Sequence, residues 1–230
     1  MRLNEKNPIS YGKPFKGHWI NGQLGENMTE NGDFDDVLNA MTTKGAKKKK
    51  KQNRLRGLRV YLAGPIDHAK DDGIGWRDSL KPYLRRRGMK PLDPCAKPIS
   101  YATYGEVGDE KEKMMELKKM GRFFELSEQM RAICHVDLRM TDVSDCVIVY
   151  INPKIPMCGT IHELVNSLQQ RKPTLVVIEG GKKNAPNWLF GIMDFNFMFD
   201  SFDDLKDFLT LVDEASFNPD MTRWVFFDFE

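Results

Sequence analysis

The feature that most constrains this fold is an alternation of short apolar runs with helical patterns along residues 58–178. Residues 58–63, 146–151 and 173–178 are apolar runs of strand length, and residues 89–92 form a shorter one. In the segments between them, apolar residues recur at helical spacing over 75–87, 110–136 and 160–170. Strands separated by helices pair in parallel, and the helices cover both faces of the sheet. The predicted fold class is therefore α/β, a parallel-sheet three-layer sandwich of the flavodoxin or Rossmann type.

The two ends of the chain differ from this central part in composition. Residues 1–56 show no sustained periodicity and contain the lysine run 47–51, which predicts a basic, loosely ordered arm. We interpret the lysine run as a solvated tether, with a nucleic-acid contact as the alternative. Beyond residue 184 the chain becomes aromatic, with an acidic helix expected around 203–215 and an apolar segment at 224–229. We expect that segment to dock on the core or on a neighbouring subunit of a homo-oligomer, a dimer or larger.

Length and composition allow one sizeable core. The chain has 230 residues, 40% of them hydrophobic, so a single folded domain over 57–230 accounts for it. Its four cysteines are widely spaced with no C-x-x-C pair, which argues against a zinc site or a disulfide framework. No apolar run is long enough to span a membrane, and the first residues lack an apolar signal core. We expect a cytoplasmic protein with reduced thiols and no membrane contact.

Two motifs lie where an apolar strand gives way to a helical pattern, which is the place where α/β proteins bind ligands. The first is Tyr-Leu-Ala-Gly-Pro-Ile-Asp at 61–67, and its Gly-Pro turn would let the backbone approach a ligand closely. The second is Cys-Gly-Thr-Ile-His-Glu-Leu at 158–164, which places the carboxylate of Glu163 near the start of a helix. That carboxylate is either a nucleophile or a charge that stabilises the helix N-terminus.

Together with an Asp-Leu pair at 137–138, these motifs resemble the nucleoside 2-deoxyribosyltransferase superfamily. The resemblance rests on Tyr-Leu-Ala-Gly-Pro, Asp-Leu and Gly-Thr-x-x-Glu-Leu in this order, and it covers residues 58–180. It implies a catalytic domain over 57–230 that exchanges nucleobases on 2′-deoxyribose without a metal or an organic cofactor. Its substrates would be a small nucleoside or nucleotide and a free nucleobase.

Two other functions stay open at this point. The superfamily also contains nucleotide N-glycosidases, so the chain could instead hydrolyse a (deoxy)nucleoside 5′-monophosphate. The second alternative is a non-catalytic nucleotide-binding module, tethered to nucleic acid by the lysine run 47–51. The presence of both Glu163 and Asp137 favours an enzyme over such a module.

The resemblance implies catalytic roles for these two carboxylates. Glu163 would attack the anomeric carbon and hold the sugar covalently, so that the overall exchange retains the configuration at that carbon. Asp137 would hydrogen-bond the base and help to protonate it as it leaves, because a base departs poorly as an anion. The alternative for Asp137 is an aspartate that caps a helix.

The predicted substrate-binding residues lie around these carboxylates in the motifs and in the loops between them: Tyr61, Gly64, Pro65, Asp67, Arg77, Asp93, Met157, Gly159 and Thr160. Tyr61 would face the sugar or be an ordinary core residue. Arg77 follows His68 and Lys70 in a loop that could hold a 5′-phosphate, with plain solvation of the basic residues as the alternative. Met157 stands where many of the transferases carry an acidic residue, so the resemblance does not name the preferred base.

Overall fold

The computed structural model describes residues 19–20, 23–24, 53–97 and 104–214. The lysine run 47–51, most of the arm predicted over 1–56 and the aromatic segment 224–229 lie outside these residues. Two short strands within the arm, β1 (Trp19–Ile20) and β2 (Gln23–Leu24), pair antiparallel and belong to a unit separate from the rest of the described chain. The sequence pattern did not predict this pairing.

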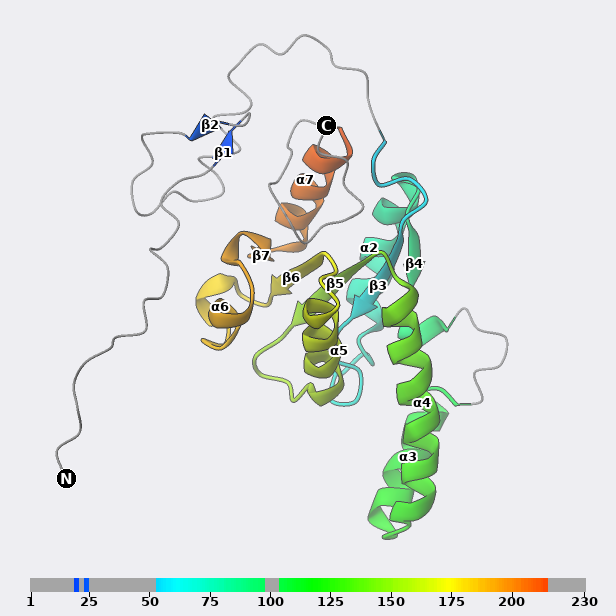
Figure 1. The fold of residues 1–230 in the computed structure, drawn as a ribbon. Coiled ribbons are helices and arrows are strands. Elements are labelled where there is room, and N and C mark those ends of the chain that lie inside the picture. The colour runs from blue at the N-terminus through cyan, green and yellow to red at the C-terminus, as the bar shows by residue number, and fades with distance from the viewer. Residues whose placement is uncertain (1–18, 21–22, 25–52, 98–103, 215–230) are drawn as a thin grey trace, which may run out of the picture. The chain divides into compact units, whose positions relative to one another are not determined.

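The larger unit is built on a five-stranded sheet in which every neighbouring pair of strands is parallel (Figure 1). The strands stand in the order β4 (Lys90–Leu92), β3 (Arg59–Ala63), β5 (Cys146–Ile151), β6 (Thr174–Ile178) and β7 (Met198–Phe199). All four predicted strands are confirmed, and the short edge strand β7 is additional. Every residue of β6 is buried, as expected for a parallel strand that is covered on both faces.

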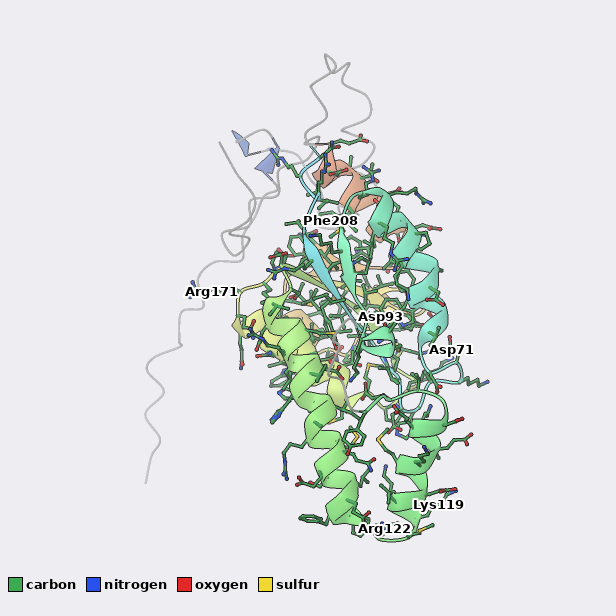
Figure 2. All side chains as sticks on the ribbon, turned by 90° about the vertical axis from the view of Figure 1, so that its right-hand side faces the viewer. Asp71, Asp93, Lys119, Arg122, Arg171 and Phe208 are labelled. Carbon is green, nitrogen blue, oxygen red and sulfur yellow. The ribbon has the colours of Figure 1, made fainter. Side chains whose placement is uncertain are left out.

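Helices cover both faces of this sheet and make it the middle of three layers, which confirms the predicted α/β class. One face carries α2 (Ile74–Arg86) and α7 (Phe202–Asp213), and the Tyr83 hydroxyl joins them by donating to the Lys206 carbonyl at 2.6 Å. The other face carries α4 (Phe123–Val143) and α5 (Cys158–Gln169). Figure 2 shows α2 and α4 on opposite sides of the strands. Four shorter helices complete the larger unit's connections: η1 (Pro94–Ala96), η2 (Lys182–Asn184), α6 (Leu189–Ile192) and η3 (Phe195–Phe197).

The amphipathic stretch 110–136, predicted as one helical segment, is two helices. α3 (Asp109–Lys119) ends at Gly121, whose φ of 71° is a left-handed conformation that glycine adopts without strain, and α4 then runs back beside α3. The pair projects beyond the sheet, with Lys119 and Arg122 at its far end (Figure 2). Because α4 continues to Val143, it carries its residues from this projection back to the strands.

The end of α4 is held by a lysine in the connection between α5 and β6. The Lys172 ammonium donates to the carbonyl oxygens of Thr141 and Ser144, at 2.5 and 2.9 Å, and so satisfies acceptors that a helix C-terminus leaves open. Burial lowers the pKa of Lys172, opposed by the nearby charges of Asp142 and Asp145.

The start of the larger unit packs against its last described helix. Leu55 is 2% exposed, and its N–H donates to Asp213 Oδ1 at 3.1 Å, while Arg87 binds Asp213 Oδ2 at 2.9 Å. The N–H of Arg54 donates to the Asp213 carbonyl at 3.5 Å. Residues 54 and 55, which the sequence assigned to the arm over 1–56, therefore make packed contacts with α7.

The four cysteines are free thiols: Cys95, Cys134, Cys146 and Cys158. Among the residues described, no helix is both long enough and apolar enough to cross a bilayer.

The strand order explains where a ligand site belongs. The chain leaves β3 for β4 on one side and then crosses to β5 on the other side, so β3 and β5 are neighbours whose following helices, α2 and α5, cover opposite faces. In open α/β sheets of this order, ligands bind outside the carboxyl ends of the two strands at this reversal.

Candidate active site

Glu163 and Tyr61 meet at this reversal. Tyr61 comes from β3 and is 0% exposed, and its hydroxyl donates to Glu163 Oε1 at 2.5 Å. Tyr61 is therefore a core residue whose polar end holds the predicted nucleophile. Glu163 stands in the second turn of α5, and the first turn of that helix contains no acidic residue. The alternative that Glu163 only stabilises the helix N-terminus is therefore wrong.

The surroundings of Glu163 oppose its ionisation. Burial, reinforced by the negative charges of Asp137 and Glu106, raises the pKa of Glu163 to about 8, although the Tyr61 hydrogen bond and the positive charge of Arg77 act in the opposite direction. Burial and the Glu163 charge also raise the pKa of Tyr61 well above its ordinary value, so its hydroxyl keeps its proton. A carboxyl group that titrates near neutral pH beside other ionisable groups is typical of a functional site.

Asp137 lies inside α4 and points into the same cluster. It is 6% exposed, and its Oδ1 lies 2.9 Å from the Lys97 ammonium, whose side chain is also 6% exposed. Because Asp137 is an interior residue of α4, the helix-capping alternative is wrong. Burial raises the pKa of Asp137, and this is opposed by Lys97 and by a hydrogen bond from Glu106.

Glu106 is a third carboxyl group of the cluster, from the loop that precedes α3. Burial, the neighbouring charge of Asp137 and hydrogen bonding with it together raise the pKa of Glu106 to about 7, against the opposing charges of Lys97 and Arg77. Neither Glu106 nor Lys97 was predicted from the sequence, because neither lies in a motif. The available signal was topological: both follow β4, which lies beside β3, so they begin from the same edge of the sheet as Tyr61.

Arg77 is not placed to bind a 5′-phosphate. Its guanidinium is 0% exposed, and its three nitrogens donate to the carbonyl oxygens of Leu62, Gly73 and Gly64 at 3.2, 2.7 and 2.9 Å. These bonds fix the loop that follows β3. The expectation that Arg77 offers a cation to a 5′-phosphate is therefore corrected: Arg77 is an internal residue that shapes the loop.

Asp93, at the end of β4, is likewise turned inward. It is 4% exposed and accepts hydrogen bonds from the Lys81 ammonium at 2.7 Å and from the Cys95 N–H at 2.9 Å. Arg77 Nε lies 3.7 Å from Asp93 Oδ1, the oxygen that also accepts from Cys95. Its carboxylate thus balances buried positive charge and caps the short helix η1, and these contacts account for it without a substrate.

Gly64 and Pro65 are buried, so the Gly-Pro turn presents little backbone to a ligand. A Cβ atom on Gly64 would stand 2.7 Å from the Trp76 ring, which stacks on Phe202 with 5.4 Å between ring centroids. The glycine is therefore required by the packing of Trp76. Asp67 lies in the following loop with an exposed side chain.

The start of α5 carries the remaining predicted residues. Met157 precedes the helix and packs, partly buried, against the main core, while Thr160 is 4% exposed. Gly159 is exposed, and a Cβ atom there would meet nothing within 4 Å. No packing contact requires a glycine at this position, one turn before Glu163, so Gly159 leaves open space on this side of the helix start.

Within the described ranges, no group of three or more His, Cys, Asp and Glu side chains has the arrangement of a metal site.

No family model matches the chain, and the search of curated proteins found no match to it. Among solved structures, the chain is similar to a 2-deoxyribosyltransferase from the psychrotolerant bacterium Bacillus psychrosaccharolyticus, with 16% identity and a TM-score of 0.44 over 65% of this chain and 90% of that chain. It is also similar to a 2-desoxiribosyltransferase from Leishmania mexicana, with 18% identity and a TM-score of 0.41 over 66% of this chain and 97% of that chain.

Proposed function

We propose that this protein is a nucleoside 2-deoxyribosyltransferase, which moves 2′-deoxyribose from one nucleobase to another through a covalent bond to Glu163. One observation carries the proposal: the Glu163 carboxyl is held by the Tyr61 hydroxyl at 2.5 Å, and its charge interacts with the buried carboxyl of Asp137. Retaining glycosyl transfer uses two carboxyl groups that act together, one as the nucleophile and one as the general acid.

In the first step, a Glu163 oxygen attacks C1′ of the nucleoside while the C1′–N bond to the base breaks. Asp137 passes a proton to the departing base, which leaves as a neutral molecule. In the second step, a nitrogen of the incoming base attacks C1′, its proton returns to Asp137, and the C1′–O bond to Glu163 breaks. Two inversions at C1′ give overall retention. Tyr61 keeps the attacking oxygen in place because its hydrogen bond fixes the carboxyl rotamer.

The raised pKa values in the cluster are compatible with Glu163 as nucleophile and Asp137 as acid. The first step needs Glu163 ionised while a proton is still held on the acid side. With a pKa of about 8, Glu163 is ionised in about one tenth of the molecules at pH 7. The same burial and repulsion keep at least one proton in the cluster near neutral pH, where an exposed carboxyl pair would hold none.

The position of Arg77 bears on the form of the substrate. Because its guanidinium is fully buried and bonded to backbone carbonyls, this cation is not available to a 5′-phosphate. This favours a nucleoside over a nucleoside monophosphate, and it favours base exchange over the N-glycosidase alternative.

The test offers the purified protein deoxyinosine or deoxyinosine monophosphate, each with and without free adenine, and follows the products by chromatography. Deoxyadenosine should form from deoxyinosine and only when adenine is present. Glu163→Gln should abolish this exchange, while Glu116→Gln, an exposed carboxyl on α3, should leave it unchanged. A 2-fluoro arabinosyl nucleoside should add its sugar mass to the wild-type protein and not to Glu163→Gln.

Two outcomes would contradict the proposal. Turnover by Glu163→Gln at the wild-type rate would remove the covalent mechanism. Release of free base from the monophosphate at equal rates with and without adenine, and no deoxyadenosine, would assign the chain to the N-glycosidases instead.

A further inference from the structure

The Lys97 side chain gives Asp137 a charged partner inside the protein, which the family resemblance does not account for. The Lys97 ammonium lies 2.9 Å from Asp137 Oδ1, and both side chains are more than nine-tenths buried. Among the described residues, neither the ammonium nor that oxygen has a well-aligned hydrogen-bond partner, so the contact is an ion pair. Opposite charges withdrawn from water in this way interact more strongly than a pair on the surface.

The two partners are fixed by separate elements of the fold. Asp137 is an interior residue of α4, and Lys97 directly follows η1, the short helix that comes after β4. The start of η1 is itself held, because the Cys95 N–H donates to Asp93 Oδ1 at 2.9 Å. If the Asp137 carboxylate turned away from Lys97, a buried ammonium would lose its compensating charge, which is unfavourable. The ion pair therefore holds the carboxyl group in one orientation.

The ammonium also distinguishes the two oxygens of Asp137. A lysine ammonium has three donors and no acceptor, so a proton on Oδ1 would face a positive charge 2.9 Å away. When Asp137 is protonated, its proton is therefore on Oδ2. When that proton leaves, the new negative charge forms beside a positive charge that is already in place, which is the arrangement that lowers the barrier of a charge-forming step.

We propose that Lys97 is a positioning residue of the reaction: it holds Asp137 so that Oδ2 carries the proton to the leaving base. This inference rests on the function proposed above for Glu163 and Asp137. As the C1′–N bond breaks, its electron pair goes to the base nitrogen, which takes the proton from Oδ2, and the Glu163 ester forms. Asp137 changes from neutral to negative while Lys97 stays positive, and the base leaves neutral. Lys97 does not touch the substrate, because it acts through Asp137.

The test compares Lys97→Met with wild type and with Lys118→Met, an exposed control on α3, in single turnovers with the protein in excess. Deoxyinosine has a base that needs a proton to leave, whereas 4-nitrophenyl 2-deoxyriboside releases an anion that needs none. At saturation we expect Lys97→Met to slow hypoxanthine release by about 100-fold, and nitrophenolate release by at most about threefold. The half-saturating concentrations should stay within about threefold of wild type, because the lysine acts on proton transfer and not on binding.

A double-mutant cycle gives a second readout, which shows whether Lys97 acts through Asp137. Asp137→Asn should itself slow hypoxanthine release, because asparagine has no acidic proton to give. Adding Lys97→Met to it should slow the release by at most about threefold more, whereas a purely structural lysine would slow both backgrounds by the same factor. The double variant has no charge at either position, so it avoids the uncompensated buried charge that each single variant carries.

The inference is overturned if Lys97→Met slows both substrates equally, or if it costs the Asp137→Asn background as much as it costs wild type. Circular dichroism and the thermal midpoint establish that each variant is folded. If wild type releases neither leaving group, the proposed function itself fails; if wild type releases both and Lys97→Met matches it on deoxyinosine, only the role of Lys97 fails.

Discussion

Replacement of Glu163 by glutamine should stabilise the protein, and the gain should grow with pH. The pKa of Glu163 is raised from an ordinary 4.5 to about 8 in the folded state. Between these two values the unfolded chain has released a proton that the folded protein still binds, so folding becomes less favourable as the pH rises. Glutamine is neutral at every pH, and its side-chain oxygen can still accept the Tyr61 hydrogen bond. The variant therefore keeps the hydrogen bond with Tyr61 and avoids the free-energy cost of the raised pKa of Glu163.

The size of the effect follows from the two pKa values. At about 1.4 kcal/mol for each pKa unit, the penalty removed by Glu163→Gln is under about 1 kcal/mol at pH 5 and about 3 kcal/mol at pH 7. It reaches its full value only above the folded pKa of about 8. With a urea m-value of about 1–3 kcal/mol/M, the midpoint of the variant should lie about 1–3 M above wild type at pH 7.

The assay is urea unfolding of both proteins at pH 5, 6, 7 and 8, followed by tryptophan fluorescence, with Glu116→Gln as the exposed control. The control should stay close to wild type throughout. A difference between Glu163→Gln and wild type that stays constant from pH 5 to pH 8 would show that the pKa of Glu163 is not raised, and the electrostatic account of the site would fail with it.

Three further changes test the packing that holds the site. Deleting residues 1–52 should leave a cooperatively folded protein, whereas deleting 1–56 also removes a fully packed leucine and should lower the free energy of unfolding by about 2–5 kcal/mol, as measured by urea unfolding. Gly64→Ala should cost about 1–3 kcal/mol, because its new methyl group would press on the tryptophan ring of α2, and equal thermal midpoints would contradict this. Lys172→Met should cost about 1–3 kcal/mol by leaving carbonyl oxygens at the end of α4 unpaired, and faster amide exchange there would be the local sign.

The strands were predictable from the sequence because a buried parallel strand is apolar at every position. The run at Cys146–Ile151 is apolar throughout, as expected for a strand covered on both faces. The predicted bounds of this strand are those of β5. The division between α3 and α4 was missed because apolar spacing continues across the turn, and Gly121 does not interrupt it. The edge strand β7, Met198–Phe199, has too few residues to produce a pattern.

The site was predictable only where a motif marks it. Glu163 and Tyr61 were found from motifs at the ends of strands, and the structure brings their side chains together. Arg77 was misread because a basic residue in a glycine-rich loop looks available to a ligand, and its burial depends on carbonyl oxygens that converge only when the loop is folded. Lys97 carries no local signature, because its place in the cluster comes from a tertiary ion pair with Asp137.

The hydrogen bond from Leu55 to Asp213 implies that the order of the elements along the chain can be changed. Among the described residues, Leu55 ahead of β3 and Asp213 at the end of α7 lie within one hydrogen bond of each other, so a short linker could join these two positions. A circular permutant, closed there and opened at the turn around Gly121, would keep every pairing of the five strands. That junction precedes the amino end of β3, whereas Tyr61 and Glu163 meet toward the opposite edge, so the permuted protein should assemble the same site.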